Sequence, residues 1–290
     1  MSIAFDTQCL LCHLQRNLEV VKPLGTQQQA MEFAKDMMRM YLDAPQDVGS
    51  PWFNPQTADL MQKHYGLPLD RMKAEKEQSN AFLLERMELI RGKVQSAPDP
   101  VFAGLQFAVL GNYLDFSALQ GQVSFEKLEA MLDQAFQLDL DKAVYENFCR
   151  ELQQGKHLLY LTDNAGEIGF DRIFAEELAA KYPHLTITFC VRGDVCLNDA
   201  TRTDAADVGI PFPVIDNGNR VPGTQIDLLS REAREALDTA DVILAKGMAN
   251  CETLHGCGYN IYYAFLVKCR RFVERFQKPM LTPMFVKERT

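Results

Sequence analysis

Long apolar runs and clusters of basic residues are missing from this sequence. No apolar stretch is long enough to span a membrane, and the N-terminus lacks the charged-then-apolar pattern of a signal peptide. No basic run of useful length occurs in a chain whose net charge is −9, which disfavours nucleic-acid binding. We therefore expect a cytoplasmic protein that binds neither membranes nor nucleic acid.

Several motifs that reveal a function directly are also missing. The chain has no Gly-x-x-x-x-Gly-Lys-Ser/Thr and no Gly-x-Gly-x-x-Gly, which disfavours nucleotide binding through those loops. It has no Gly-x-Ser-x-Gly elbow of the kind that carries a nucleophilic serine. No Asp-x-Asp pair follows the first predicted strand, which argues against phosphatases of the haloacid-dehalogenase type.

The composition is that of an ordinary soluble protein, with 290 residues that are 47% hydrophobic and 24% charged. This length suggests one or two domains. The 8 cysteines are scattered, several within apolar runs, and we interpret them mostly as reduced buried thiols. The pair Cys9 and Cys12 leaves a zinc or redox role open, and His255 and Cys257 are candidates for the two further zinc ligands.

Residues 1–153 are predicted to form an all-helical domain, because apolar residues recur there at helical spacing and no strand pattern is seen. A polar loop with several prolines is expected at 44–55. The predicted helices span residues 6–18, 26–42, 57–65, 68–94, 101–110, 124–136 and 140–153.

Residues 154–290 change to an alternation of strands and helices, which predicts an α/β domain with a mostly parallel sheet and helices on both faces. Thr224 and Asp227 resemble a capping box at the start of one of these helices. The predicted strands are 157–162, 185–191, 211–215, 241–245 and an edge strand at 279–286, and the predicted helices are 168–181, 200–208, 226–239 and 259–277.

The loop after the first predicted strand carries the most distinctive chemistry. Asp163 and Asn164 offer the oxygen atoms that Mg²⁺ or Mn²⁺ prefers. Gly166 would let the backbone approach an anion at the start of the next helix, and Glu167 follows it. Asp and Asn are also the commonest helix caps, so a capping role for this pair is the alternative.

The second strand is followed by a similar loop. Asp199 is a second candidate metal carboxylate, because parallel strands bring their carboxyl ends to one edge of a sheet. Arg192 and Asn198 are candidates for substrate binding. A capping role for Asn198 or Asp199 is equally compatible with the pattern. Asp171 either supports the site from behind or is a solvated helix residue, and we favour the second interpretation.

The fourth strand ends in Lys246-Gly247, which we expect at the same edge of the sheet. Lys246 would supply a point charge for a phosphate, and Gly247 would allow backbone N–H groups to approach it. Asn250 and Glu252 are candidates to hold substrate hydroxyls or a metal-bound water. The alternative is an ordinary polar loop with a solvated lysine.

Three motifs in this order resemble those of the damage-control phosphatase family, domain of unknown function eighty-nine: Asp163-Asn-Ala-Gly-Glu167, Asn198-Asp199-Ala-Thr201 and Lys246-Gly-x-Ala-Asn250-x-Glu252. Three further segments resemble its prokaryotic cysteine-pair subfamily: Cys9-x-x-Cys12, Gly111-Asn112-x-x-Asp115-Phe116 and Lys268-Cys269. Two positions depart from the family pattern: Met248 stands where we expect Gln, and Asp70-Arg-Met-Lys73 stands where Asp-Pro-Tyr is usual.

The resemblance implies a helical domain packed on a Rossmann-like α/β domain. It implies metal-dependent hydrolysis of phosphate monoesters of small metabolites, including damaged or side-product sugar phosphates. It implies a divalent ion, Mn²⁺, Co²⁺, Ni²⁺ or Mg²⁺, at Asp163, Asn164 and Asp199. The positions matching Glu167, Lys246 and Asn250 would contact the substrate.

Three functions therefore remain as hypotheses. The first is a phosphatase in which Asp163, Asn164, Asp199 and Lys246 form the catalytic group, with either water or Asp163 attacking phosphorus. The second is a protein that binds a phosphometabolite without hydrolysing it. The third is a carboxylate methyltransferase using S-adenosylmethionine, which the acidic first loop disfavours. The oligomeric state is not predicted.

Overall fold

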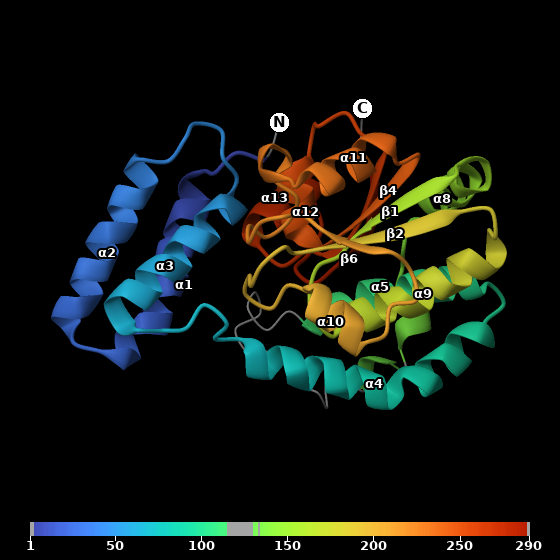
Figure 1. Cartoon of the computed structure of the whole chain (residues 1–290), viewed down its shortest axis with the longest axis horizontal. Coiled ribbons are helices and arrows are strands. Elements are labelled where there is room, and N and C mark those ends of the chain that lie inside the picture. The colour runs from blue at the N-terminus through green and yellow to red at the C-terminus, as the bar shows by residue number, and fades with distance from the viewer. Residues whose placement is uncertain (1–2, 115–129, 133, 289–290) are drawn as a thin grey trace.

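A computed structural model describes residues 3–114, 130–132 and 134–288 (Figure 1). The helices that precede the sheet are α1 (Thr7–Val21), α2 (Gln27–Leu42), α3 (Phe53–Tyr65), α4 (Lys73–Gln95), α5 (Pro100–Gly111) and α8 (Lys142–Gln154). The later helices are α9 (Glu167–Lys181), α10 (Arg202–Asp207), α11 (Arg231–Thr239), α12 (Gly247–Leu254) and α13 (Arg270–Phe276). Short 3-10 turns occupy Lys22–Leu24, Ser50–Trp52, Asn112–Leu114, Ala135–Gln137 and Ile226–Leu228.

The strands form a 6-stranded sheet in the order β3-β2-β1-β4-β5-β6. All neighbouring strands run parallel except β5 and β6, which are antiparallel. The predicted α/β class with a mostly parallel sheet is thus confirmed. The strands are β1 (His157–Leu161), β2 (Thr186–Val191), β3 (Val214–Asp216), β4 (Val242–Lys246), β5 (Ile261–Leu266) and β6 (Pro283–Lys287).

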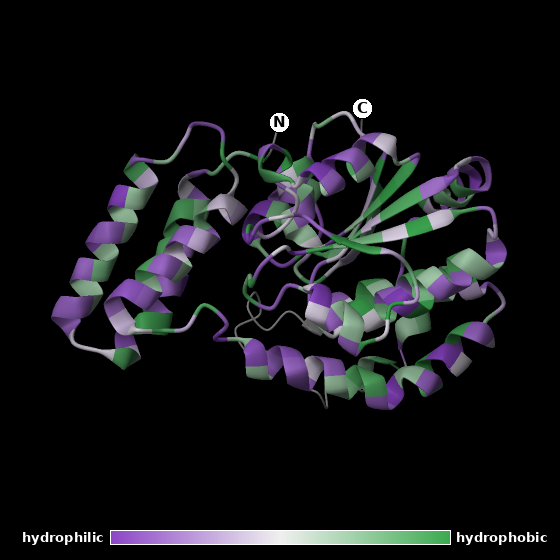
Figure 2. Ribbon diagram, viewed as in Figure 1, coloured by the Kyte–Doolittle hydropathy of each residue, from purple (hydrophilic) through white to green (hydrophobic). Residues whose placement is uncertain are grey.

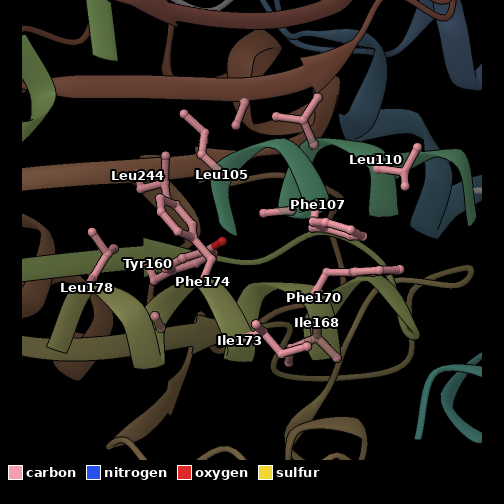
Figure 3. Packing of buried hydrophobic residues seen from close by; sticks show 14 of the residues in the cluster. Leu105, Phe107, Leu110, Tyr160, Ile168, Phe170, Ile173, Phe174, Leu178 and Leu244 are labelled. Carbon is pink, nitrogen blue, oxygen red and sulfur yellow. The ribbon is translucent and has the colours of Figure 1, made fainter. Parts of the chain in front are cut away.

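Helices cover both faces of the sheet. Successive residues of a strand point to opposite sides of the sheet, so a single strand contributes to the core on each face. Tyr160 joins a core formed with α4, α5, α8 and α9, where it lies beside Phe174 in a cluster that also contains Phe107 and Phe170 (Figure 3). Leu159 joins a second core, formed with α11, α12 and α13. Figure 2 shows the strands between these layers as predominantly hydrophobic. Both layers are visible in Figure 1.

Helices α1, α2 and α3 form a smaller unit beside the sheet (Figure 1). Phe33, Met37 and Met61 are central to its separate core. Local caps fix its helices: the Asp6 side chain accepts a hydrogen bond from the Cys9 N–H, and Thr26 forms a capping box with Gln29. The predicted division after residue 153 remains a prediction, and the main core is shared across it, because α4, α5 and α8 pack on the sheet.

The predicted helix at 259–277 is wrong in its first half. Residues Ile261–Leu266 form β5, and only Arg270–Phe276 are helical. All six positions of β5 are buried, and a short, uniformly apolar run has no periodicity that distinguishes a strand from a buried helix. Its isoleucine and aromatic residues were the available signal for a strand.

Two further local predictions are wrong. The loop expected at 44–55 ends early, because α3 begins at Phe53 and accommodates Pro55 in its first turn, where a proline costs no helical hydrogen bond. Thr224 forms no capping box, and Ser230 caps α11 instead.

The Asp115-Phe116 pair and most of the predicted helix 124–136 lie outside the described residues. Across the part of the chain that the structure describes, no helix has the length and apolarity needed to cross a membrane.

Candidate active site

The ends of β1 and β4 meet where the strand order reverses. The chain leaves β1 to reach β2 on one side, and β4 lies on the other side of β1. Asp163 follows β1, and Gly247 follows β4 directly. In open α/β sheets, ligands bind in the crevice at such a point, beyond the carboxyl ends of the strands.

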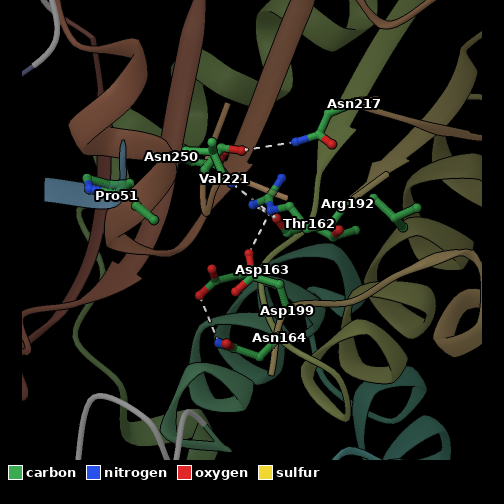
Figure 4. A network of polar contacts seen from close by, with 12 residues as sticks. Pro51, Thr162, Asp163, Asn164, Arg192, Asp199, Asn217, Val221 and Asn250 are labelled. Carbon is green, nitrogen blue, oxygen red and sulfur yellow. Dashed lines mark hydrogen bonds and ion pairs between the residues drawn. The ribbon is translucent and has the colours of Figure 1, made fainter. Parts of the chain in front are cut away.

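The loops after β1 and β2 are joined by their backbones. The Ala200 N–H donates to the Asp163 carbonyl at 2.7 Å, and the Ala165 N–H donates to the Asn198 carbonyl at 2.8 Å. Asn164 and Asp199 form an isolated β-bridge. The three residues predicted as metal ligands, Asp163, Asn164 and Asp199, therefore lie together at one rim of the sheet (Figure 4).

None of these three side chains caps the helix that follows it. The N-cap of α9 is Gly166, with no side-chain cap. The N-cap of α10 is Thr201, which forms a capping box with Asp204. The capping alternative is therefore wrong for Asp163, Asn164 and Asp199.

Arg192 fixes the position of Asp199. Its Nε donates to Asp199 Oδ2 at 2.6 Å, and its Nη2 donates to the Thr162 carbonyl at 3.1 Å. The guanidinium is only 1% exposed. Burial alone would lower the pKa of Arg192, but the Asp199 carboxylate outweighs burial and raises it. Arg192 thus stays charged and holds Asp199 at the rim.

Two side-chain amides clamp Asp163 to Glu167. Asn164 Nδ2 donates to Asp163 Oδ2 and to Glu167 Oε2, both at 2.8 Å. Asn112, at the end of α5, donates from Nδ2 to the same two oxygens at 2.8 and 2.9 Å. The sequence placed Asn112 in a family motif, and the predicted site residues did not include it. Its side-chain oxygen also accepts from the Leu266 N–H at 3.1 Å, which ties the clamp to β5.

Behind this clamp lies a fully buried ion cluster centred on Lys246. Its Nζ donates to Glu167 Oε1 at 2.7 Å, to Asp171 Oδ1 at 2.6 Å and to the Ala108 carbonyl at 2.8 Å. Tyr160 donates its hydroxyl to Asp171 at 2.7 Å. All three Nζ hydrogens are therefore engaged within the protein.

This cluster changes the interpretation of Asp171. The prediction that Asp171 is solvated is wrong, because its side chain is completely buried. Burial raises the pKa of its carboxyl to about 7, the Lys246 charge opposes that rise, and Glu167 adds to it. For Lys246, burial lowers the pKa, but Asp171 and Glu167 outweigh it and raise the pKa. The lysine thus carries its charge in a site that water does not reach.

The segment after β4 is the helix α12 and not the expected polar loop. Gly247 begins it at a φ of 78°, and a side chain there would place its Cβ 2.1 Å from Asp163 Oδ2, so only glycine fits. Asn250 donates to the Thr162 carbonyl at 3.1 Å and the Lys246 carbonyl at 2.7 Å, and accepts from the Thr224 hydroxyl. Asn250 thus joins the ends of β1 and β4.

A cavity of about 240 Å³ opens over this rim. Five of the predicted site residues line it: Asp163, Asn164, Asn198, Asp199 and Glu252. The opposite wall includes residues of α1 and the segment 268–271. Burial raises the pKa of Glu252 to about 7, against the lowering effect of Arg271. The other predicted residues do not line the cavity and lie behind it: Gly166, Glu167, Arg192, Lys246, Gly247 and Asn250.

The backbone N–H of Gly166 is already used within the fold. It donates to the Asn80 side-chain oxygen at 2.7 Å. Asn80 in turn donates to Asp204, which also accepts an ion pair from Lys76 at 2.7 Å. This chain of contacts anchors the start of α9 to α4 and α10, so the Gly166 amide acts as a structural anchor here.

The cysteine pair lines the cavity. Cys9, Cys12 and Cys269 are all part of its wall. Cys12 is exposed and Cys9 is half-buried, so the expectation of core thiols is wrong for this pair. Among residues 3–114, 130–132 and 134–288, no group of three or more His, Cys, Asp or Glu side chains is placed to hold a metal. The zinc hypothesis with His255 and Cys257 is therefore wrong.

The predicted metal ligands Asp163, Asn164 and Asp199 differ from such a group of His, Cys, Asp or Glu side chains, because they are two carboxylates and one amide. The carboxylates are 7% and 4% exposed at the cavity wall, and the Asn164 amide nitrogen already donates to Asp163 and Glu167. That leaves the Asn164 oxygen as its donor atom for a cation. An all-oxygen set of this kind fits Mg²⁺ or Mn²⁺.

Comparison with known proteins identifies the family. A family model described as "Damage-control phosphatase ARMT1-like domain" matches residues 5–281. The chain belongs to this family. The resemblance seen in the three motifs is thus confirmed, while membership of the cysteine-pair subfamily remains a prediction.

Three curated archaeal proteins illustrate the relationship. A protein of Methanocaldococcus jannaschii named as uncharacterized is 28% identical over 285 residues, 94% of this chain and 92% of its own. A damage-control phosphatase of Archaeoglobus fulgidus is 34% identical over 198 residues, 67% of each chain. A damage-control phosphatase of Pyrococcus horikoshii is 32% identical over 179 residues, 60% of this chain and 61% of its own.

A solved structure shares the fold. The crystal structure of a DUF89 family protein from Pyrococcus horikoshii superposes with a TM-score of 0.84, covers 100% of both chains and is 22% identical. The two proteins therefore share their fold.

Proposed function

We propose that this family member is a metal-dependent phosphatase that hydrolyses phosphate monoesters of small metabolites, either sugar phosphates or damaged phosphometabolites. The observation that carries the proposal is the convergence of Asp163, Asn164 and Asp199 on the wall of one cavity, with none of them acting as a helix cap. Two of the curated relatives are named damage-control phosphatases, which supports the same reaction.

Asp163, Asn164 and Asp199 would hold the divalent cation, Mn²⁺, Co²⁺, Ni²⁺ or Mg²⁺. Such an ion neutralises phosphate charge and lowers the pKa of a bound water. The chain's own contribution is to fix the ligands. Arg192 holds Asp199, and the Asn112 amide holds Asp163 against Glu167. Their positions are thus set before a substrate arrives, which is the main requirement of phosphoryl transfer.

Lys246 has a positioning role in this proposal. Its three donors are engaged by Glu167, Asp171 and Ala108, so contact with a phosphate would require the loss of one of these bonds. We infer that Lys246 orients Glu167, and that Glu167 in turn orients both clamping amides. Among the predicted substrate-binding residues, Asn198 and Glu252 line the cavity and are placed to contact the substrate.

Asp163 has a second possible use as a nucleophile that forms an aspartyl phosphate. Two amide donors hold its Oδ2, which keeps the carboxylate in a fixed orientation for attack. Acid quenching during turnover, followed by mass spectrometry, separates the two routes. A phosphorylated Asp163 supports direct attack, and its absence under burst conditions supports attack by water.

The proposal is tested with purified protein stripped of metal by a chelator. Phosphate release from p-nitrophenyl phosphate and a panel of sugar phosphates is measured after addition of Mn²⁺, Co²⁺, Ni²⁺ or Mg²⁺. We expect release that depends on added metal. Binding of these esters without release would favour a phosphometabolite-binding protein, and calorimetric binding of S-adenosylmethionine would favour a methyltransferase.

A further inference from the structure

A second cavity, of about 470 Å³, adjoins the one over the rim. The two share His13, Arg16, Asn54 and Leu197 in their walls. The second cavity lies between α1, α3 and the segment that leads into α4. The two cavities are therefore adjacent, and Arg16 lies in the wall of both.

Two arginines that pair with no carboxylate of the described residues line the second cavity. Arg16 is half-buried, and in the described ranges its side chain makes no hydrogen bond or ion pair. Arg71, also half-buried, donates only to the Met61 sulfur at 3.2 Å, and no described carboxylate lies within 4.0 Å of it. Burial and the nearby charge of Arg16 lower the pKa of Arg71, so the two guanidinium groups lie close enough to repel each other.

His13 adds a polar atom without a partner to the same wall. Its side chain is 9% exposed, and its Nδ1 is paired with the Tyr41 hydroxyl at 2.7 Å. Its Nε2 is buried and, within the described part of the chain, has no hydrogen-bond partner. Burial, followed by the charge of Arg16, lowers the pKa of His13 to about 4, so the ring is neutral at pH 7.

The carboxylates near this cavity do not neutralise the arginines. Glu19 and Glu75 line it, but both are exposed. Glu19 accepts from Gln15, and Glu75 acts on Arg71 only through longer-range charge. Elsewhere, half-buried arginines do pair, as Arg172 does with Glu176. Keeping two adjacent guanidinium groups partly desolvated and unpaired costs free energy, and an incoming anion removes that cost.

We propose that Arg16 and Arg71 form a second anion subsite, and that the substrates are phosphate monoesters with a second anionic group, a carboxylate or another phosphate. The inference rests on the proposed phosphatase function. The ester phosphate lies at Asp163 and Asp199, and the second anion lies between the two guanidinium groups. Guanidinium groups suit both kinds of anion, because their paired N–H groups match two oxygens at once.

The test compares matched substrates that differ in the second anion. The pairs are 6-phosphogluconate with glucose 6-phosphate, fructose 1,6-bisphosphate with fructose 6-phosphate, and 3-phosphoglycerate with glycerol 3-phosphate. We expect the wild-type kcat/KM to favour the more anionic member of at least one pair by about tenfold or more, the value of one charge-assisted hydrogen bond. The first and third pairs report a carboxylate, and the second reports a phosphate.

Variants locate the preference. Arg16→Gln and Arg71→Gln should each reduce the ratio of kcat/KM within the favoured pair, and the double variant should bring it close to one. The ratio cancels any general loss of activity or folded protein. Arg231→Gln is the matched control, because the Arg231 side chain is 92% exposed on α11 and, within the described part of the chain, its ion pair is with Glu235. It should leave the ratio unchanged.

Two results overturn the inference: a wild-type enzyme with no preference in any pair, or a preference that survives in the double variant. If no ester is hydrolysed with any metal, the proposed function fails, and calorimetry with the same pairs still tests the subsite. Tighter binding of the more anionic member, lost in the double variant, supports the subsite. Equal binding of both members overturns it.

Discussion

The Asn112 side chain reaches from the end of α5 to Asp163 at the end of β1, with its Nδ2 2.8 Å from Asp163 Oδ2. The same nitrogen lies 2.9 Å from Glu167 Oε2. This approach is close because Gly111 precedes it, and a side chain at Gly111 would place its Cβ 2.8 Å from the Phe170 ring. A residue of the helical half of the chain thus orients the first candidate ligand.

Asn112→Ala should therefore reduce turnover with little direct effect on substrate contacts. Side chains that orient metal ligands typically contribute about 10–100-fold to metal affinity or activity. We expect a fall of that size in kcat, with a smaller change in KM and a higher metal concentration for half-maximal rate. The Gln95→Ala substitution on α4, which removes only an exposed bond to Glu177, serves as the control. Unchanged metal dependence in Asn112→Ala would contradict the orienting role.

Asp163→Asn and Asp199→Asn should each abolish metal-dependent phosphate release. Each substitution keeps the shape of the side chain but removes a negative charge from the proposed ion site. Metal content after dialysis, measured by mass spectrometry, should fall in both variants. Asp238→Asn on α11, where the carboxylate is exposed and pairs with Arg234, should retain metal and activity. Near-normal hydrolysis by either rim variant with added Mn²⁺ would show that the ion site is misplaced.

Lys246→Met should destabilise the fold as well as the site. It would leave Glu167 and Asp171 without their shared cation in a region that is 0% exposed. Removing one partner of a buried ion pair typically costs about 3–5 kcal/mol. Urea unfolding should show a loss of that size, whereas Lys35→Met, in an exposed pair with Glu32, should stay within about 0.5 kcal/mol. A loss at Lys246 no larger than that at Lys35 would contradict the stabilising role of this buried cluster.

The stability of the protein should fall in mild acid because of His13. Burial lowers the folded-state pKa of His13 to about 4 from 6.5, so between these values the unfolded chain binds more protons than the folded one. Stability contributed by neutral His13 is present above pH 6.5 and is lost as the pH falls towards 4. The full loss corresponds to about 3 kcal/mol.

This prediction is measured as the difference in stability between wild type and His13→Gln, because carboxyl groups contribute to the pH dependence of stability in both proteins. Urea unfolding at pH 7.5, 5.5 and 4.5 is followed by the fluorescence of Trp52, the only tryptophan, which lies beside Phe53 at the start of α3. The acid-dependent loss should be smaller in the variant. Parallel pH profiles for the two proteins would show that His13 does not titrate in this way.

The sequence was sufficient to predict the rim. Asp163, Asn164 and Asp199 follow strands that run parallel, and neighbouring parallel strands bring their carboxyl ends to the same edge. The family motifs pointed to the same residues. The alternation of strands and helices likewise predicted the sheet, except at β5, where a uniformly apolar run carries no period.

The buried network could not be predicted in the same way. Whether Asp171 faces solvent or Lys246 depends on how α9 is rotated about its axis where it packs between β1 and α5. The sequence pattern of α9 alone does not determine this rotation. The contact of Asn112 with Asp163 crosses 51 positions of the chain, and that of Lys246 with Ala108 crosses 138. Local patterns predict helices and loops, whereas these contacts arise only when distant elements pack together.

The packing of α4, α5 and α8 against the sheet also determines how the gene can be divided. A fragment beginning at β1 would expose the face that contains Tyr160 and Phe174, and it would lack Asn112 and Ala108, which contact Asp163 and Lys246. Neither half would carry a complete centre. Recombination between relatives is therefore expected to keep residues from α4 onward as a single inheritance unit, while the α1–α3 unit, with its separate core, can be exchanged only for one that restores the cavity wall.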